Sequence, residues 1–325
     1  MNKIAHFIVH SKVATLVAAL LCTGLWVTTF ITGGNGDSTS ASPILQALIA
    51  YVIYATLGAF LMRVNERTTF NIPGKTTLTG TLFFIGSALI PQIGTNTTSI
   101  IHLALLSLAS YVLLSSYRQH DAMGHYLLAF SLVGIASLVT PAMLFIAPLL
   151  LICCILLQSL HLRTILAAIF GLLLPYWVAL CALFVTDTPL PTAAFVNALT
   201  NPAVQSAHTS FSVYDYTLSS KLLQLSWLLL LIIPGIMATF FSHSALKART
   251  QSSLYFLTTA TLLMTAIIIV VPGLYTAFMP LLFLATSISA AAFFITDSHQ
   301  GAKIYLITLM VVWILIAALS VWNNF

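Results

Sequence analysis

The sequence has very few charged residues. Asp, Glu, Lys and Arg together make up 5% of its 325 residues, whereas hydrophobic residues make up 60%. In soluble globular domains about a quarter of the residues are charged. The shortage excludes an ordinary soluble domain and predicts an all-α fold: a polytopic bundle of transmembrane helices that forms a single integral membrane domain over residues 1–325.

Motifs for binding metals, cofactors and nucleic acids are also missing. The cysteines stand inside apolar runs, without the paired spacing of a zinc site or the loop placement of a disulfide framework, and we interpret them as small hydrophobic residues: Cys22, Cys153, Cys154 and Cys181. The Lys and Arg residues are scattered in ones and twos and form no basic patch. We therefore expect no metal, no cofactor and no nucleic-acid partner.

Apolar segments of spanning length are frequent. They lie at 13–32, 44–62, 76–93, 98–116, 164–186, 222–242 and 304–323. Two longer regions, 126–159 and 253–295, hold too many apolar residues for one helix, and each has a central proline, Pro141 or Pro272. Splitting them there predicts about 11 spans. A hairpin of full spans and a re-entrant pair of half-helices both fit each split region.

The distribution of cations predicts the orientation of the bundle. With a cytoplasmic N-terminus, all Lys and Arg residues except Lys221 fall on the cytoplasmic side, and the C-terminus is periplasmic. The loop "YRQHDAMGH", residues 117–125, lacks the ligand spacing of a metal site and suits anchoring at lipid headgroups.

Ionisable residues are almost absent from the predicted spans. His102 is the clear case, about one turn into the fourth span from its periplasmic end. It is either a group that binds substrate or moves a proton, or a neutral histidine hydrogen-bonded near the interface. The lack of intramembrane carboxylates argues against an ion-coupled pump.

The longest polar interruption is "DTPLPTAAFVNALTNPAVQSAHTSFSVYDYTLSSK", residues 187–221, which we predict to be a periplasmic loop with an interfacial helix between its prolines at 191 and 202. It offers Asp187, His208, Asp215 and Lys221, and Asp37 lies in another outward loop. A carboxylate at the outer face is able to act as general base towards a sugar hydroxyl, so Asp37 and Asp215 are candidate catalytic residues. The other three, with His102, are candidate substrate-binding residues. Solvated loop residues are the alternative.

Longer stretches of the sequence resemble two groups of known membrane proteins. The runs "VNERTTFNIPGKTTLTGTLFFIGSALIP" and "HYLLAFSLVGIASLVTPAMLFIAPLLLICCILLQSLHLRTILAAIFGLLLPYW" resemble a family of Bacteroidota-type polytopic inner-membrane proteins of unknown function, which implies an inner-membrane location. More remotely, the proline-containing hairpin before the Arg-bearing turn is similar to the middle spans of glycosyltransferases that use polyprenyl-phosphate sugars. In those enzymes a catalytic acid lies in the first outward loop, where Asp37 stands in this chain. That loop is shorter here and lacks their further acidic residues.

Three functions remain open from the sequence. The first is a role in the cell envelope on lipid-linked glycan at the outer face, with membrane lipids and a lipid-linked substrate as partners. The second is a non-catalytic subunit or scaffold of an envelope complex. The third is a carrier of lipidic or weakly charged cargo, which the two proline-broken hairpins suggest.

Overall fold

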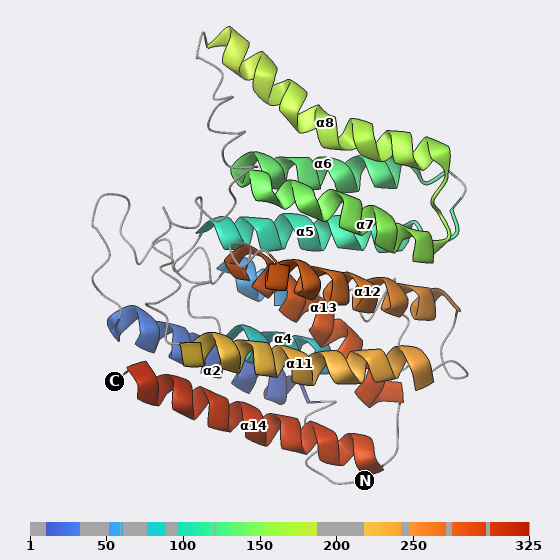
Figure 1. The fold of residues 1–325 in the computed structure, drawn as a ribbon. Coiled ribbons are helices and arrows are strands. Elements are labelled where there is room, and N and C mark those ends of the chain that lie inside the picture. The colour runs from blue at the N-terminus through green and yellow to red at the C-terminus, as the bar shows by residue number, and fades with distance from the viewer. Residues whose placement is uncertain are drawn as a thin grey trace.

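The computed structural model describes a helical protein. The described residues are 11–32, 52–58, 60, 77–88, 97–119, 121–186, 218–241, 248–270, 275–296 and 300–324. All regular secondary structure within these ranges is helical, which confirms the predicted all-α class. The helices lie side by side with their long axes roughly aligned, and Figure 1 shows them stacked from α8 at the top to α14 at the bottom.

The helices coincide with the apolar segments of the sequence. Their bounds are α2 (Lys12–Thr32), α4 (Leu78–Ala88), α5 (Thr97–Ser115), α6 (Met123–Val139), η2 (Pro141–Phe145), α7 (Ile146–Cys154), η3 (Ile155–Leu157), α8 (Leu162–Val185), α11 (Leu218–Phe241), α12 (Ala248–Val270), α13 (Tyr275–Thr296) and α14 (Gln300–Asn324). Because α11 begins at Leu218, the last residues of the predicted 187–221 loop belong to a helix. The rest of that loop, with its predicted interfacial helix, lies outside the described residues.

The chain turns back at the predicted proline break. Thr140 has an extended backbone (φ −136°, ψ 104°), and Pro141 opens the 3-10 turn that leads into α7. Proline disfavours a helical conformation in the residue before it, which explains why α6 ends at Val139. The returning arm ends beside the start of α6, where the Tyr126 hydroxyl lies 2.9 Å from Ser159 Oγ. The region is therefore a hairpin whose arms have similar lengths.

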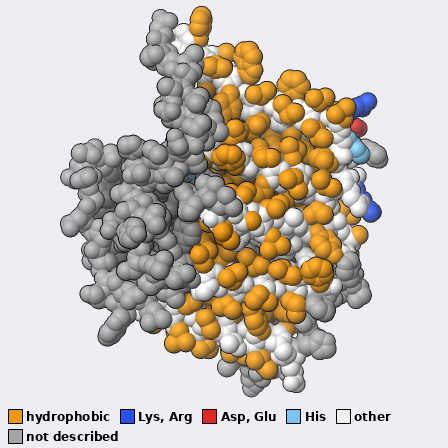
Figure 2. All heavy atoms as spheres, viewed as in Figure 1, with side chains coloured by type: hydrophobic (Ala, Val, Ile, Leu, Met, Phe, Trp, Pro, Cys, Tyr) orange, Lys and Arg blue, Asp and Glu red, His pale blue; other side chains and the backbone are white. Residues whose placement is uncertain are grey.

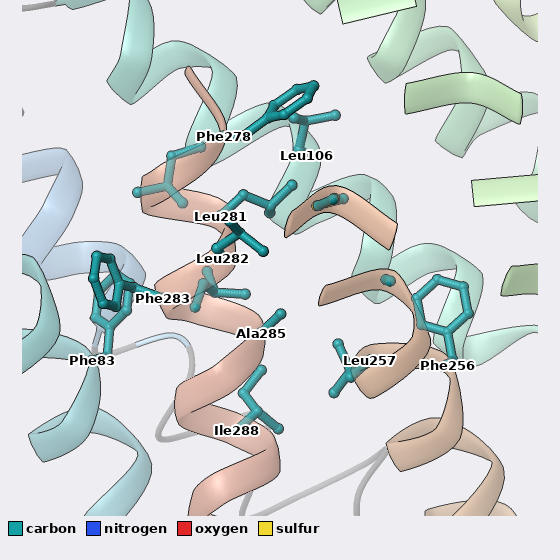
Figure 3. Close-up of a cluster of buried hydrophobic side chains, with 14 of the residues drawn as sticks. Phe83, Leu106, Phe256, Leu257, Phe278, Leu281, Leu282, Phe283, Ala285 and Ile288 are labelled. Atoms are coloured by element: carbon teal, nitrogen blue, oxygen red, sulfur yellow. The ribbon is translucent and has the colours of Figure 1, made fainter. Parts of the chain in front are cut away.

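Two helices form the centre of the bundle. Every residue of α4 is buried, as is every residue of α13 from Leu281 to Ala292. α13 packs against α4, α5, α11 and α12, and Figure 3 shows its side chains facing Phe83 of α4, Leu106 of α5 and Leu257 of α12. A helix that is apolar all round is expected in such a position.

Small residues bring α6 and α8 into close contact. The side chains that α8 buries recur at helical spacing, and they are Thr164, Ala167, Ala168, Gly171 and Pro175. A Cβ atom on Gly171 would clash with the backbone of Leu127, and one on Gly134 would lie 2.7 Å from Leu172 O. Glycine is therefore required at both positions for the backbones to approach this closely.

Hydrogen bonds join helices that are distant in the sequence. Trp313 Nε1 of α14 donates to Ile85 O of α4 over 2.8 Å. Near the start of α2, Thr77 Oγ1 donates to Ser11 O over 3.0 Å, and further along Cys22 Sγ lies 3.7 Å from Ser87 Oγ. α2 and α4 therefore run parallel.

The surface is apolar along the helices and polar at one end. Figure 2 shows hydrophobic side chains covering the described part of this face, with the visible Lys, Arg, Asp and His side chains along one edge. That edge is the end at which α5 leads into α6 and α8 begins (Figure 1). Two helices, Leu162–Val185 and Ala248–Ile269, are by length and composition able to cross a membrane.

Candidate functional site

Of the six predicted site residues, His102 is the one whose side chain the structure describes. Asp37, Asp187, His208 and Asp215 lie outside the described residues. Lys221 lies in the first turn of α11, so its backbone is helical. The structure therefore tests the surroundings of His102, and leaves the grouping of the other five as a prediction.

His102 lies in α5, and its side chain is buried against the neighbouring helices. Its side chain is 1% exposed, and its Nε2 atom lies 3.3 Å from Ala136 O in the last turn of α6. The same carbonyl oxygen accepts the backbone N–H of Thr140 over 3.1 Å, at the residue where α6 stops. The imidazole thus contacts the end of α6 next to the proline break.

This contact assigns the tautomer of the ring. A carbonyl oxygen only accepts, so Nε2 carries the hydrogen and Nδ1 has a lone pair. Nδ1 has no hydrogen-bond partner among the described residues. A buried polar atom without a partner costs about 1–3 kcal/mol, which makes His102 the least satisfied polar side chain in α5 and α6. An acceptor of this kind is able to bind a hydroxyl that donates to it.

The opposite end of the hairpin holds a group of buried hydroxyls. Ser159 Oγ lies 2.9 Å from the Tyr126 hydroxyl and 3.2 Å from Ser116 Oγ, and Thr164 Oγ1 donates to Ser159 O over 3.3 Å. Ser116 directly follows α5, Tyr126 lies in α6, Ser159 precedes α8 and Thr164 lies in its first turn, and all four are buried. In contrast to His102, each hydroxyl has a partner, so the group fastens three chain segments together.

Beside these hydroxyls, two turns are joined through an arginine. Arg118 Nε donates to Gln158 Oε1 over 2.8 Å, and the backbone N–H of Arg118 donates to Leu157 O over 3.2 Å. Both Arg118 and Gln158 have left-handed backbones, with φ of 55° and 54°. Left-handed conformations are rare for residues other than glycine, asparagine and aspartate, and they persist where surrounding contacts hold them. Sequence reasoning missed this pairing; its one signal was a glutamine inside the apolar run "LLQSLHL".

The described residues give no metal centre. Within them, no group of three or more His, Cys, Asp or Glu side chains is placed to hold a metal ion. Cys22, Cys153 and Cys154 are buried free thiols, and Cys181 is an exposed one. Comparison of the chain with known protein families, curated proteins and solved structures finds no match.

Proposed function

We propose that the protein is a multi-pass protein of the bacterial inner membrane, with about 11 spans, a cytoplasmic N-terminus and a periplasmic C-terminus. Six helices support this proposal by their length, since they have 21 to 25 residues and about 20 are needed to cross a bilayer: α2, α8, α11, α12, α13 and α14. The parallel course of α2 and α4 fits a span between them. The position of Arg118 and Arg163 at one end of the hairpin fits a cytoplasmic end.

Under this orientation, His102 lies at the outer end of the bundle. It contacts the end of α6 that is remote from Arg118, and the predicted loops with Asp37, Asp187, His208 and Asp215 belong to the same side. We place there the proposed activity of the protein, a reaction on a lipid-linked glycan. Asp37 and Asp215 are the proposed general bases, and His102, Asp187, His208 and Lys221 bind the substrate.

The observation that carries this proposal is the Nδ1 atom of His102, which has no hydrogen-bond partner among the described residues. A sugar hydroxyl that donates to it would supply the missing hydrogen bond. In a purely structural bundle, an apolar side chain at this position would avoid the unpaired nitrogen.

Complementation of a deletion strain tests the proposal. The measurements are the glycan composition of the envelope and the protein level for Asp37→Asn, Asp215→Asn and His102→Gln, with Asp121→Asn at the opposite end as the matched carboxylate control. We expect the first three to lose activity at unchanged protein level, and the control to complement. Full complementation by both Asp37→Asn and Asp215→Asn rejects the catalytic proposal. A periplasmic reporter fused to the C-terminus tests the orientation separately.

A second function, a non-catalytic subunit of an envelope complex, is favoured by the buried hydroxyls of the central helices. Thr286 Oγ1 donates to Leu282 O over 2.7 Å, Ser287 Oγ to Leu284 O over 2.8 Å, and Ser289 Oγ to Thr286 O over 3.1 Å. These hydroxyls are occupied by their own helix, as expected for residues chosen to pack helices closely. Purification of the protein with a stoichiometric partner, together with complementation by the carboxylate variants, distinguishes this function from the first.

A further inference from the structure

The junction where α5, η3 and α8 meet carries two exposed arginines. Arg118 follows the last turn of α5, and Arg163 lies in the first turn of α8. Their neighbours in the chain are tied to one residue, because Ser116 Oγ contacts Ser159 Oγ and Thr164 Oγ1 donates to Ser159 O. The backbones at the two arginines therefore lie in the same small region, which we call the basic junction (Arg118, Gln158 and Arg163).

The basic junction has positive charge that the described residues do not neutralise. Arg118 is held by its Nε bond to Gln158 and lies over the Tyr117 ring, and within the described residues its two terminal nitrogens make no hydrogen bond. Arg163 makes no hydrogen bond or ion pair that the structure describes, and it adds a cation to the positive end of the α8 dipole. Asp121, the one acidic residue among those described, forms no salt bridge with either arginine. An anion is the ligand that such a junction stabilises.

An apolar face continues from the basic junction along α8. α8 packs against α6, and its outer side is lined by exposed side chains at helical spacing: Leu162, Leu166, Phe170, Leu173 and Trp177. Phe170 is 65% exposed and Trp177 is 66% exposed. At 1.5 Å per residue, the face from Leu162 to Trp177 is about 22 Å long, which is comparable to an extended acyl chain.

We propose that the basic junction and this face of α8 bind an anionic phospholipid of the cytoplasmic leaflet, with the headgroup phosphate at Arg118 and Arg163 and an acyl chain along Leu166, Phe170 and Leu173. Planar guanidinium groups suit the phosphate oxygens. An acyl chain that lies along the adjoining face exchanges its contacts with other lipids for contacts with apolar side chains, so it loses no apolar contact. A protein partner would also cover the apolar face, but it would not require a phosphate beside the arginines. This inference rests on the proposed membrane insertion and cytoplasmic position of the junction.

Retention of lipid by the purified full-length protein tests the inference. The protein in detergent is incubated with equal amounts of long-chain phosphatidylglycerol and phosphatidylcholine, and bound lipid is counted by native mass spectrometry. We expect selective retention of phosphatidylglycerol, and Arg118→Gln and Arg163→Gln should each lower the ratio of bound phosphatidylglycerol to phosphatidylcholine about fivefold. Arg249→Gln, which removes an exposed cation from the first turn of α12, is the matched control and should leave the ratio unchanged.

Further experiments distinguish the possible ligands from one another and show whether the variants still fold. Arg163→Lys keeps the charge and should keep most of the selectivity, and its elution profile shows whether an arginine variant still folds. Short-chain phosphatidylglycerol and inorganic phosphate should compete poorly, because they lack the acyl chain. Equal retention of the two long-chain lipids, an equal effect of Arg249→Gln, efficient competition by inorganic phosphate, or a co-purified protein covering α8 overturns the inference. Lipid selectivity in detergent does not depend on orientation, so a cytoplasmic C-terminal reporter would reject the proposed topology and the assignment to the cytoplasmic leaflet, and would leave the lipid site itself standing.

Discussion

The contact between α6 and α8 gives the sharpest prediction, which concerns Gly171→Ala. The added Cβ would lie 3.0 Å from Leu127 Cα and 3.1 Å from Leu127 C, and closer still to Leu127 O. Ordinary van der Waals contacts of a Cβ atom start near 3.4 Å. Because the obstructing atoms are backbone, no side chain is able to rotate away, and α8 must move outward.

The magnitude follows from two opposing effects. Overpacking of this kind costs about 1–3 kcal/mol. Alanine is the better helix former and returns about 1 kcal/mol. We therefore expect Gly171→Ala to lower the free energy of unfolding by up to about 2 kcal/mol.

Gly24→Ala isolates the clash. Gly24 lies in the middle of α2, and a Cβ there would meet nothing within 4 Å. The gain in helix propensity is common to both variants, so the difference between their unfolding free energies should be the clash alone, about 1–3 kcal/mol. The assay is reversible unfolding in mixed micelles. Adding Gly134→Ala to Gly171→Ala should cost less than the sum of the single changes, because both separate the same helices. Equal stability of Gly24→Ala and Gly171→Ala would refute the close α6–α8 contact.

Three further predictions use the same unfolding assay. Tyr126→Phe removes a hydroxyl from Ser159, which keeps a second partner, so the loss should be about 1 kcal/mol; no loss would show that the hydroxyl group does not fasten the junction. Trp313→Phe leaves Ile85 O without its donor from α14 and should cost about 1–3 kcal/mol, whereas an unchanged stability would contradict that contact. His102→Phe removes a half-satisfied buried ring and should leave stability unchanged or raise it while complementation is lost; a loss of more than about 2 kcal/mol would make the histidine structural.

Helix positions were predictable because hydropathy and proline decide them locally. The break at Pro141 is an example: a proline inside a long apolar run restricts the residue before it, whatever surrounds the run. The faces by which helices pack were not predictable. Where nearly all residues are apolar, the sequence has no polar face to exclude from the core, and the contacts of Gly171 with Leu127 and of Trp313 with Ile85 depend on the arrangement of the whole bundle.

The candidate site was predicted only in part for a related reason. An ionisable residue in an apolar run is easy to find, and His102 was found in this way. The left-handed backbones of Arg118 and Gln158 carry no such signal, because neither residue type favours that conformation. Asp37 and Asp215 lie outside the described residues, and their catalytic role stays a prediction.

The two ends of the α6 hairpin differ in a way that bears on function. At the Arg118 end, the hydroxyls of Ser116, Tyr126 and Ser159 bond to one another, so these three hydroxyls stabilise the turn and need no external partner. At the other end, His102 Nε2 contacts Ala136 O, and its Nδ1 has no partner in the part of the chain that the structure describes. A hydrogen-bonded group holds a fold together, whereas a buried acceptor without a donor costs stability and is best explained by a ligand that donates to it. The exposed arginines of the first end are suited to bind an anion, and His102 at the second end is the position from which a search for substrate should start.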